Sequence, residues 1–266
     1  MFHLFNKIVR GNANPIANKT TNDYSYLKKT PRHTSASVTL LGHKISFPDA
    51  ASFLTAYKGI FENEVYRFES NGSSPVIIDG GANIGLSVIY FKQLYKDAVI
   101  HAFEPDQKIF KFLTQNVEVY GYNNINLYNL GLWDTSTTLK FYSEGADGGR
   151  ISEVDNKHPD KCIEVKVVAL RKFLQNKIDF LKLDIEGAEY RVLKDCSDIL
   201  NNVDKIFMEY HSVVGQEQNL DEILKILKSA GFRYYIQHWE GGILHPFIKR
   251  NIYLNMDLML NVYAFR

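Results

Sequence analysis

The sequence predicts an α/β protein with a mostly parallel sheet and helices on both faces. Residues 75–86 and 180–189 each contain a short apolar strand, a turn with glycine and the start of a helix. Between and after them, apolar runs alternate with segments whose apolar residues repeat at helical spacing. This alternation is typical of strand–helix–strand units in a parallel sheet.

Length and composition indicate a main domain, residues 71–266, with an amino-terminal extension, residues 1–70. The 266 residues are 45% hydrophobic and 23% charged, and the net charge of +1 provides no basic field for nucleic acid. The two cysteines lack metal-type spacing, and no apolar run is long enough to span a membrane or resembles an export signal. We expect a cytoplasmic protein that neither spans a membrane nor binds nucleic acid. Its oligomeric state stays open.

The extension is expected to cap the main domain. Residues 1–36 are rich in Asn, Thr and Lys and have few periodic apolar positions, so only a short helix near the start is expected there. The strands at 38–41 and 44–47 read as a hairpin. A helix with apolar residues at helical spacing then starts at Pro48 and Asp49.

The first strand of the main domain predicts a site for a nucleotide-like cofactor. Residues 76–78 have no polar alternation, as expected for a strand buried on both faces, so the turn after them lies at the sheet edge where open α/β sheets bind ligands. A dinucleotide fingerprint would need glycine at Asn83, which disfavours a nicotinamide oxidoreductase. Instead, Asp79 ends the strand, and Gly81 and Gly85 stand on either side of Asn83 at alternate positions. Glycines at this edge let the backbone approach a ligand.

A second strand, residues 98–103, ends in an acid. A carboxylate at the position of Glu104 can accept both ribose hydroxyls of a nucleoside. The alternative is a surface acid before a helix cap, because Pro105 and Asp106 also make a good helix start, and the two roles are compatible. After the third strand, Leu132 lies where related folds hold an adenine ring.

The middle of the chain predicts a lid and a second functional edge. Half-exposed strands at 138–142 and 163–167 flank a glycine-rich loop at 145–150, a candidate for a mobile lid. A buried strand beginning at residue 180 then ends at Asp184 and a glycine turn. Lys182 lies inside this strand and is expected to have a carboxylate partner, because a lone buried ammonium is costly.

The last part of the chain places a histidine near this edge. The strand at 206–208 is expected to end just before the stretch that contains His211. We therefore expect Asp184 and His211 to follow neighbouring strands and both to face the crevice. Alternating segments at 234–236 and 259–263 predict two closing strands.

Four motifs occur in an order and spacing that carry a family resemblance. They are Asp79-Gly80-Gly81-Ala82-Asn83-Ile84-Gly85, Phe103-Glu104-Pro105-Asp106, Leu181-Lys182-Leu183-Asp184-Ile185-Glu186-Gly187-Ala188-Glu189 and Met208-Glu209-Tyr210-His211. Together they resemble the FkbM-type family of class I S-adenosylmethionine methyltransferases, from roughly residue 72 to 232. The chain departs from the family pattern at Arg171, where an acid is usual, and at Asp195, where glycine is usual. Neither position lies in a donor motif.

The resemblance implies a Rossmann-like class I methyltransferase fold. It also implies that S-adenosylmethionine donates a methyl group to a hydroxyl, on a small-molecule or glycan acceptor such as a sugar. The residues expected to bind this cofactor are Asp79, Gly80, Gly81, Ala82, Asn83, Gly85, Glu104, Pro105, Asp106, Leu132 and Asp184.

Methyl transfer to a hydroxyl needs a base beside the donor methyl, and two residues are candidates. His211 has the better intrinsic pKa for a base at neutral pH, and Asp184 is the other candidate. Each is equally compatible with a structural role. We expect a metal-free site, although Asp184, Glu186, Glu209 and His211 could together hold a divalent cation. The alternative function is a non-catalytic nucleotide- or glycan-binding module on the same fold.

Overall fold

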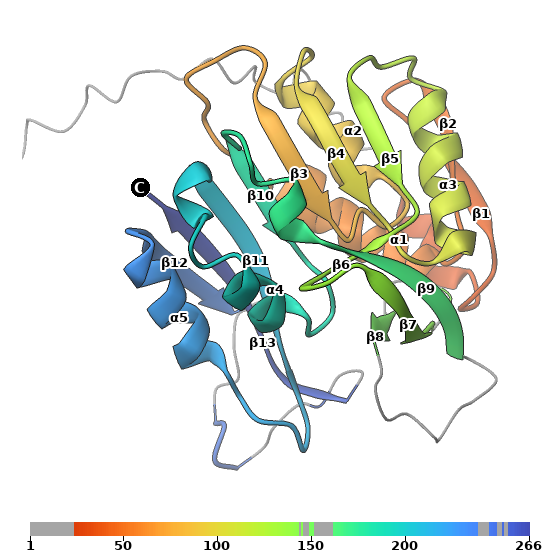
Figure 1. The fold of residues 1–266 in the computed structure, drawn as a ribbon. Coiled ribbons are helices and arrows are strands. Elements are labelled where there is room, and N and C mark those ends of the chain that lie inside the picture. The colour runs from red at the N-terminus through yellow and green to blue at the C-terminus, as the bar shows by residue number, and fades with distance from the viewer. Residues whose placement is uncertain are drawn as a thin grey trace, which may run out of the picture.

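The computed structural model describes residues 24–143, 145, 149–151, 162–238, 245–248, 252 and 255–266. Among these residues the main sheet has the strand order β12-β13-β11-β10-β3-β4-β5 (Figure 1). The strands are β3 (Val76–Gly80), β4 (Val99–Phe103), β5 (Ile125–Tyr128), β10 (Phe180–Leu183), β11 (Lys205–Val213), β12 (Arg233–His238) and β13 (Met256–Phe265). The pairs from β5 to β11 are parallel, and β13 runs antiparallel to both β11 and β12. The predicted mostly parallel α/β fold is confirmed.

Helices cover both faces of this sheet, as Figure 1 shows. They are α2 (Leu86–Leu94), α3 (Gln107–Glu118), α4 (Glu189–Asp195) and α5 (Leu220–Ser229). Successive strand residues point to opposite faces, so Ile77 packs in one core with α2 and α3, whereas Ile78 packs in the other core with α4 and α5. Both side chains are fully buried, which explains why β3 reads as an unbroken apolar run.

The described part of the extension is a hairpin followed by a helix. It contains η1 (Ser25–Lys29), β1 (Ala36–Leu40), β2 (His43–Phe47), α1 (Ala50–Tyr57) and the π-helical turn η2 (Lys58–Glu62). Asp49 caps α1 by accepting a hydrogen bond from the Ser52 amide at 2.9 Å. Phe47 and Phe53 are buried in the same core as Ile77.

A buried amide fastens this extension to the main sheet. The Asn116 side chain of α3 accepts from the Ser46 amide at 2.8 Å and donates to the carbonyl oxygens of Ser46 and Ile84 at 2.8 and 2.9 Å. The extension therefore shares hydrogen bonds and a core with residues beyond 70. A domain boundary at residue 70 stays a prediction.

A smaller sheet follows the third parallel strand. It contains β6 (Gly131–Trp133), β7 (Thr137–Tyr142), β8 (Arg150–Ile151) and β9 (Cys162–Ala169), in the order β6-β9-β7-β8. Residues 146–148 of the predicted lid at 145–150 and all of residues 1–23 lie outside the described residues. No helix in the described ranges combines the length and apolar character needed to cross a bilayer.

The strand β11 is longer than the sequence predicts. We expected an end at residue 208, but pairing with β13 continues to Val213. In that register Glu209 lies opposite Asn261, and His211 lies opposite Met259. Glu209 and His211 are therefore inside a strand and share one of its faces, rather than following its end.

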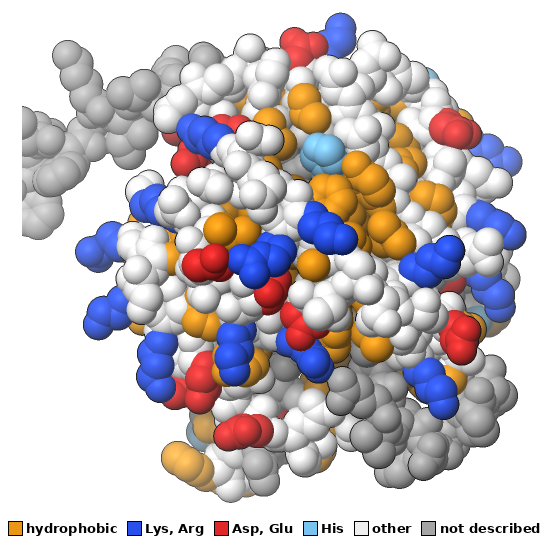
Figure 2. All heavy atoms as spheres, in the orientation of Figure 1, with side chains coloured by type: hydrophobic (Ala, Val, Ile, Leu, Met, Phe, Trp, Pro, Cys, Tyr) orange, Lys and Arg blue, Asp and Glu red, His pale blue; other side chains and the backbone are white. Residues whose placement is uncertain are grey.

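The molecular face drawn in Figure 2 has mixed charge. Lys and Arg side chains are dispersed over it and Asp and Glu side chains lie among them, without a continuous basic strip. This pattern accords with the net charge of +1. The expectation that nucleic acid is not a partner stays a prediction.

Candidate active site

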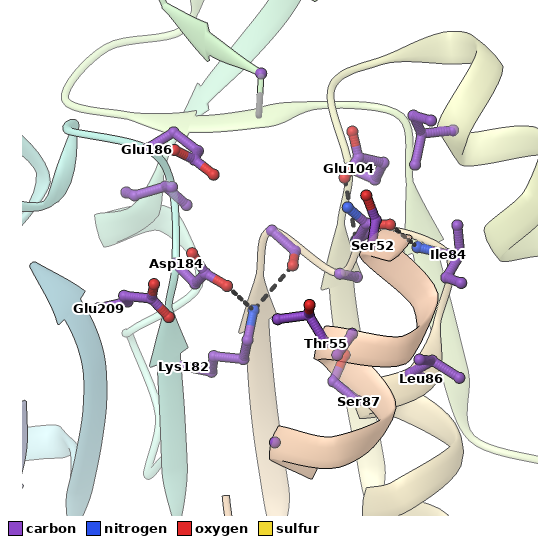
Figure 3. A pocket seen from close by; sticks show the side chains of 18 of the residues that line it. Ser52, Thr55, Ile84, Leu86, Ser87, Glu104, Lys182, Asp184, Glu186 and Glu209 are labelled. Carbon is purple, nitrogen blue, oxygen red and sulfur yellow. Dashed lines mark hydrogen bonds and ion pairs between the residues drawn. The ribbon is translucent and has the colours of Figure 1, made fainter. Parts of the chain in front are cut away.

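A cavity of about 710 Å³ lies at the carboxyl edge of the parallel strands. Its wall combines the turn after β3, the residues after β4 and β10, part of β11, and α1 of the extension. Figure 3 shows Asp184, Glu186 and Glu209 on one side of it, with Glu104 and Ser52 across from them. The volume falls within the range of small-molecule sites, about 300–1,000 Å³.

Eight of the eleven residues predicted to hold the cofactor line this cavity. They are Gly81, Ala82, Asn83, Glu104, Pro105, Asp106, Leu132 and Asp184. Asp79, Gly80 and Gly85 lie behind the wall instead. An added Cβ at Gly80 would meet Leu132 at 2.7 Å, and one at Gly85 would meet Leu113 at 2.9 Å. Both glycines allow close packing behind the cavity.

The turn after β3 is held against the two neighbouring strands. The Gly81 and Ala82 amides donate to the Phe103 carbonyl at 3.0 and 2.9 Å. Gly81 has φ +77°, and a Cβ on it would lie 1.9 Å from the Asp184 carbonyl oxygen. Asn83 has φ 48°, the left-handed conformation that asparagine tolerates. The turn is therefore shaped by the chain around it as well as by the space it leaves for a ligand.

Glu104 is fixed at the edge of the cavity by two backbone amides. Its Oε2 accepts from the Asn83 amide at 3.1 Å, and its Oε1 accepts from the Asp106 amide at 2.9 Å. Burial is the largest influence and raises the pKa of Glu104 to about 8, although both hydrogen bonds act to lower it. Each carboxylate oxygen retains a lone pair for a further donor, such as a ribose hydroxyl.

Lys182 has the carboxylate partners that its position predicted. Its Nζ lies 3.2 Å from Asp79 Oδ1 and 3.6 Å from Asp184 Oδ2, and it donates to the Gly80 and Gly81 carbonyls at 3.0 and 2.8 Å. Burial acts to lower the pKa of Lys182, but the two carboxylates outweigh burial and raise it. Asp79 is thus engaged by this ammonium, and it also accepts from the Ser87 hydroxyl.

Three carboxylates face the cavity from the side opposite Glu104. Asp184, Glu186 and Glu209 all line it, and Figure 3 shows their side chains grouped above Lys182. Burial raises the pKa of Glu209, and repulsion from Asp184 adds to this effect. Burial also raises the pKa of Glu186 well above its usual range. Burial and mutual repulsion therefore disfavour the ionised forms of Glu186 and Glu209.

His211 lies behind this group and does not line the cavity. Its side chain is only 1% exposed; Nδ1 is 3.1 Å from Glu189 Oε1, and Nε2 is 3.5 and 3.9 Å from carboxylate oxygens of Glu209 and Glu186. Burial acts to lower the pKa of His211, but Glu186 and Glu189 outweigh it and raise the pKa well above its usual range. Because its side chain is buried and does not line the cavity, the geometry argues against His211 as the base, whereas Asp184 lines the cavity.

One wall of the cavity comes from the extension, for which the sequence predicts only a capping role. Ser52, Thr55 and Asn63 bring hydroxyl and amide groups to it, and Tyr66 lines it as well. The sequence signal was the presence of small polar residues between the apolar positions of this helix. This signal does not show that the residues line a cavity, because a polar helix face is as readily exposed to solvent as to a ligand.

The strand order and the ligand-sized cavity at the carboxyl edge are those of the class I methyltransferase fold. Residues 79–234 match the model of the methyltransferase FkbM domain, and the chain belongs to this family. Family membership supports S-adenosylmethionine as the cofactor, and the residues fit it, since Glu104 retains acceptor capacity beside a cavity of suitable size.

Two named relatives and one solved structure are moderately similar to this chain. "Methyltransferase 1" of Beauveria bassiana is 28% identical over 165 residues, covering 53% of this chain and 66% of that protein. The chain thus spans just under two thirds of that relative. The "31-O-demethyl-FK506 methyltransferase FkbM" of Streptomyces tacrolimicus is 25% identical, covering 72% of this chain and 86% of that protein. The crystal structure of methyltransferase FkbM from Methylobacillus flagellatus shares the fold, with a TM-score of 0.50 and 19% identity, covering 76% of this chain and 46% of that one.

Proposed function

We propose that the chain is an S-adenosylmethionine-dependent O-methyltransferase whose acceptor is a hydroxyl of a sugar, glycan or related small molecule. The observation that carries this proposal is that one cavity joins the predicted donor residues to a group of carboxylates. A relative whose name gives 31-O-demethyl-FK506 as its substrate supports methylation of oxygen.

The donor occupies the half of the cavity nearest β3 and β4. Glu104 accepts hydrogen bonds from the ribose hydroxyls, and Leu132 packs against the adenine. The turn formed by Gly81, Ala82 and Asn83 faces the amino-acid end. Bound in this way, S-adenosylmethionine supplies an activated methyl group, and the protein's task is to align an acceptor oxygen with it.

The acceptor occupies the half of the cavity between α1 and the carboxylates. Ser52, Thr55 and Asn63 offer hydrogen-bonding groups there, which suits a polyhydroxylated molecule. The reacting hydroxyl faces Asp184 and Glu209, and its proton leaves toward this side of the cavity. General-base assistance of this kind typically contributes about 10²–10⁴-fold in rate.

Donor binding is tested by calorimetry with S-adenosylhomocysteine. One molecule should bind per chain, and Glu104→Ala should weaken binding by about 1–3 kcal/mol, because ribose hydroxyls lose their acceptor. Glu118→Ala on the exposed end of α3 is the matched control and should leave affinity unchanged. Binding of NAD but not of S-adenosylhomocysteine would refute the proposed function.

Catalysis is tested with labelled S-adenosylmethionine and a panel of sugars, oligosaccharides and hydroxylated polyketides. Asp184→Asn should abolish transfer to any accepted hydroxyl while S-adenosylhomocysteine still binds. If the donor binds and no hydroxyl in the panel is methylated, the non-catalytic binding module becomes the better description.

A further inference from the structure

The carboxylates of the cavity and the buried histidine converge on one point. One ligand atom each from Asp184, Glu186 and His211 lies within 4.8 Å of the other two, and Glu209 Oε1 lies 3.5 Å from His211 Nε2. Two atoms 4.8 Å apart on opposite sides of an ion correspond to bonds of half that length, about 2.4 Å, which small side-chain movements shorten to the values of divalent cations. The spacing therefore fits a single ion.

The histidine is oriented as a metal ligand would be. Its Nδ1 lies 3.1 Å from Glu189 Oε1, which leaves Nε2 facing Glu186 and Glu209. Glu189 is itself fixed, because Oε1 accepts from the Ile185 amide at 3.1 Å and Oε2 accepts from the Gly187 amide at 3.0 Å. A carboxylate that holds the far nitrogen of a histidine is the usual support of a metal-binding imidazole.

An independent observation comes from β13. Asn261 is 94% buried, lines the cavity and lies directly opposite Glu209 in the strand register. Its Oδ1 has no hydrogen-bond partner among the described residues. A buried amide oxygen without a partner is costly, and amide oxygen is a ligand that hard divalent cations accept directly or through water.

The charge balance also calls for a cation. Asp79, Asp184, Glu186, Glu189 and Glu209 surround Lys182 and His211, so the acids outnumber the basic groups. The Lys182 ammonium is already engaged, because it donates to the Gly80 and Gly81 carbonyls and lies 3.6 Å from Asp184. A dication beside Glu186 and Glu209 would offset much of the remaining negative charge.

We propose that Asp184, Glu186, Glu209 and His211 form a divalent-cation site, supported by Glu189 and Asn261, that binds the acceptor oxygen. This inference rests on the proposed function and names the group that activates its acceptor. The ion holds the hydroxyl oxygen beside the donor methyl and lowers its pKa, and the proton passes to a water molecule or a cavity carboxylate. The oxygen then bonds to the methyl carbon as the carbon–sulfur bond breaks, and S-adenosylhomocysteine leaves with the sulfur electron pair.

The test is Mn²⁺ binding to the full chain after dialysis against a chelator, followed by electron paramagnetic resonance of the free ion. Mn²⁺ suits a donor set of carboxylates and one imidazole. One ion should bind per chain, and Glu189→Gln should weaken it about 10–100-fold, as for other residues that orient a metal-binding histidine. Glu209→Gln should weaken it at least as much. Asp221→Asn, in the exposed Asp221–Glu222 pair of α5, is the control and should change nothing.

The outcomes test the cation site separately from donor binding. The proposed site would be overturned if Asp221→Asn abolished Mn²⁺ binding. It would also be overturned if Glu189→Gln and Glu209→Gln both left Mn²⁺ affinity unchanged. Methyl transfer that continues undiminished with the chelator present would also overturn it, while the proposed function would stand. Absence of S-adenosylhomocysteine binding would instead remove the proposed function, whatever Mn²⁺ does. Glu209→Gln keeps the result interpretable if Glu189→Gln fails to fold.

Discussion

Replacing Gly81 with alanine tests how the two edges of the cavity are packed together. The left-handed conformation at φ +77° costs a non-glycine residue about 1–2 kcal/mol. The new Cβ would also lie 1.9 Å from the Asp184 carbonyl oxygen. Overpacking of this kind typically costs about 1–3 kcal/mol. Gly81→Ala should therefore lower the free energy of unfolding by about 2–5 kcal/mol.

Gly121→Ala is the matched control, because it changes the backbone strain and not the packing. Gly121 has φ +62°, and a Cβ there would meet nothing within 4 Å. Its cost should be about 1–2 kcal/mol, so the two variants should differ by about 1–3 kcal/mol. Guanidinium unfolding followed by circular dichroism measures both. Equal destabilisation of the two variants would show that the Asp184 carbonyl imposes no packing restriction at Gly81.

Three further variants test the electrostatics of the buried groups. Lys182→Met should cost about 3–5 kcal/mol in urea unfolding, because it leaves Asp79 buried without its ammonium, and adding Asp79→Asn should restore part of the loss. With the pKa of Glu104 at about 8, the ionised fraction rises from about one in eleven at pH 7 to about ten in eleven at pH 9. Calorimetry with 5′-methylthioadenosine, which lacks the amino-acid group, should therefore show roughly tenfold tighter binding at pH 9, and Glu104→Gln should remove this pH dependence. Burial acts to raise the pKa of Asp49, but hydrogen bonds that include the Ser52 amide outweigh it and lower the pKa to about 2. Asp49→Ala should lower the free energy of unfolding by about 1–2 kcal/mol at neutral pH. Because the folded-state pKa of Asp49 is depressed, this loss of stability should be complete above about pH 4 and should vanish as pH falls through about 2. A loss of stability that persists at low pH would contradict this assignment.

The parts of the fold that local sequence determines were predicted well. The strand at 76–78 reads as buried on both faces because every residue in it is apolar, and the cap at Asp49 follows from one side chain and the next turn. The partners of Lys182 could be anticipated because burying an ammonium leaves few alternatives.

The parts that depend on distant pairing were not predicted. The length of β11 is set by β13, about 50 residues later in the chain, so nothing near His211 showed that the strand continues past it. For the same reason the side chain of His211 was expected in the crevice, whereas it lies behind the cavity among the carboxylates of Glu186, Glu189 and Glu209. The cavity wall at Ser52 and Thr55 likewise depends on α1 meeting the turn after β3, which is a tertiary contact.

The attachment of Lys182 to both strand ends has a consequence for how such a protein can diversify. Because one ammonium binds the chain at Gly81 and at Asp184, the donor turn and the acidic loop form a single unit. The opposite wall is encoded separately, in residues 48–66. If acceptors bind there as proposed, the cavity-lining residues Ser52, Thr55 and Asn63 can be mutated to recognise new molecules while the donor half stays intact, which makes them the natural targets for library construction.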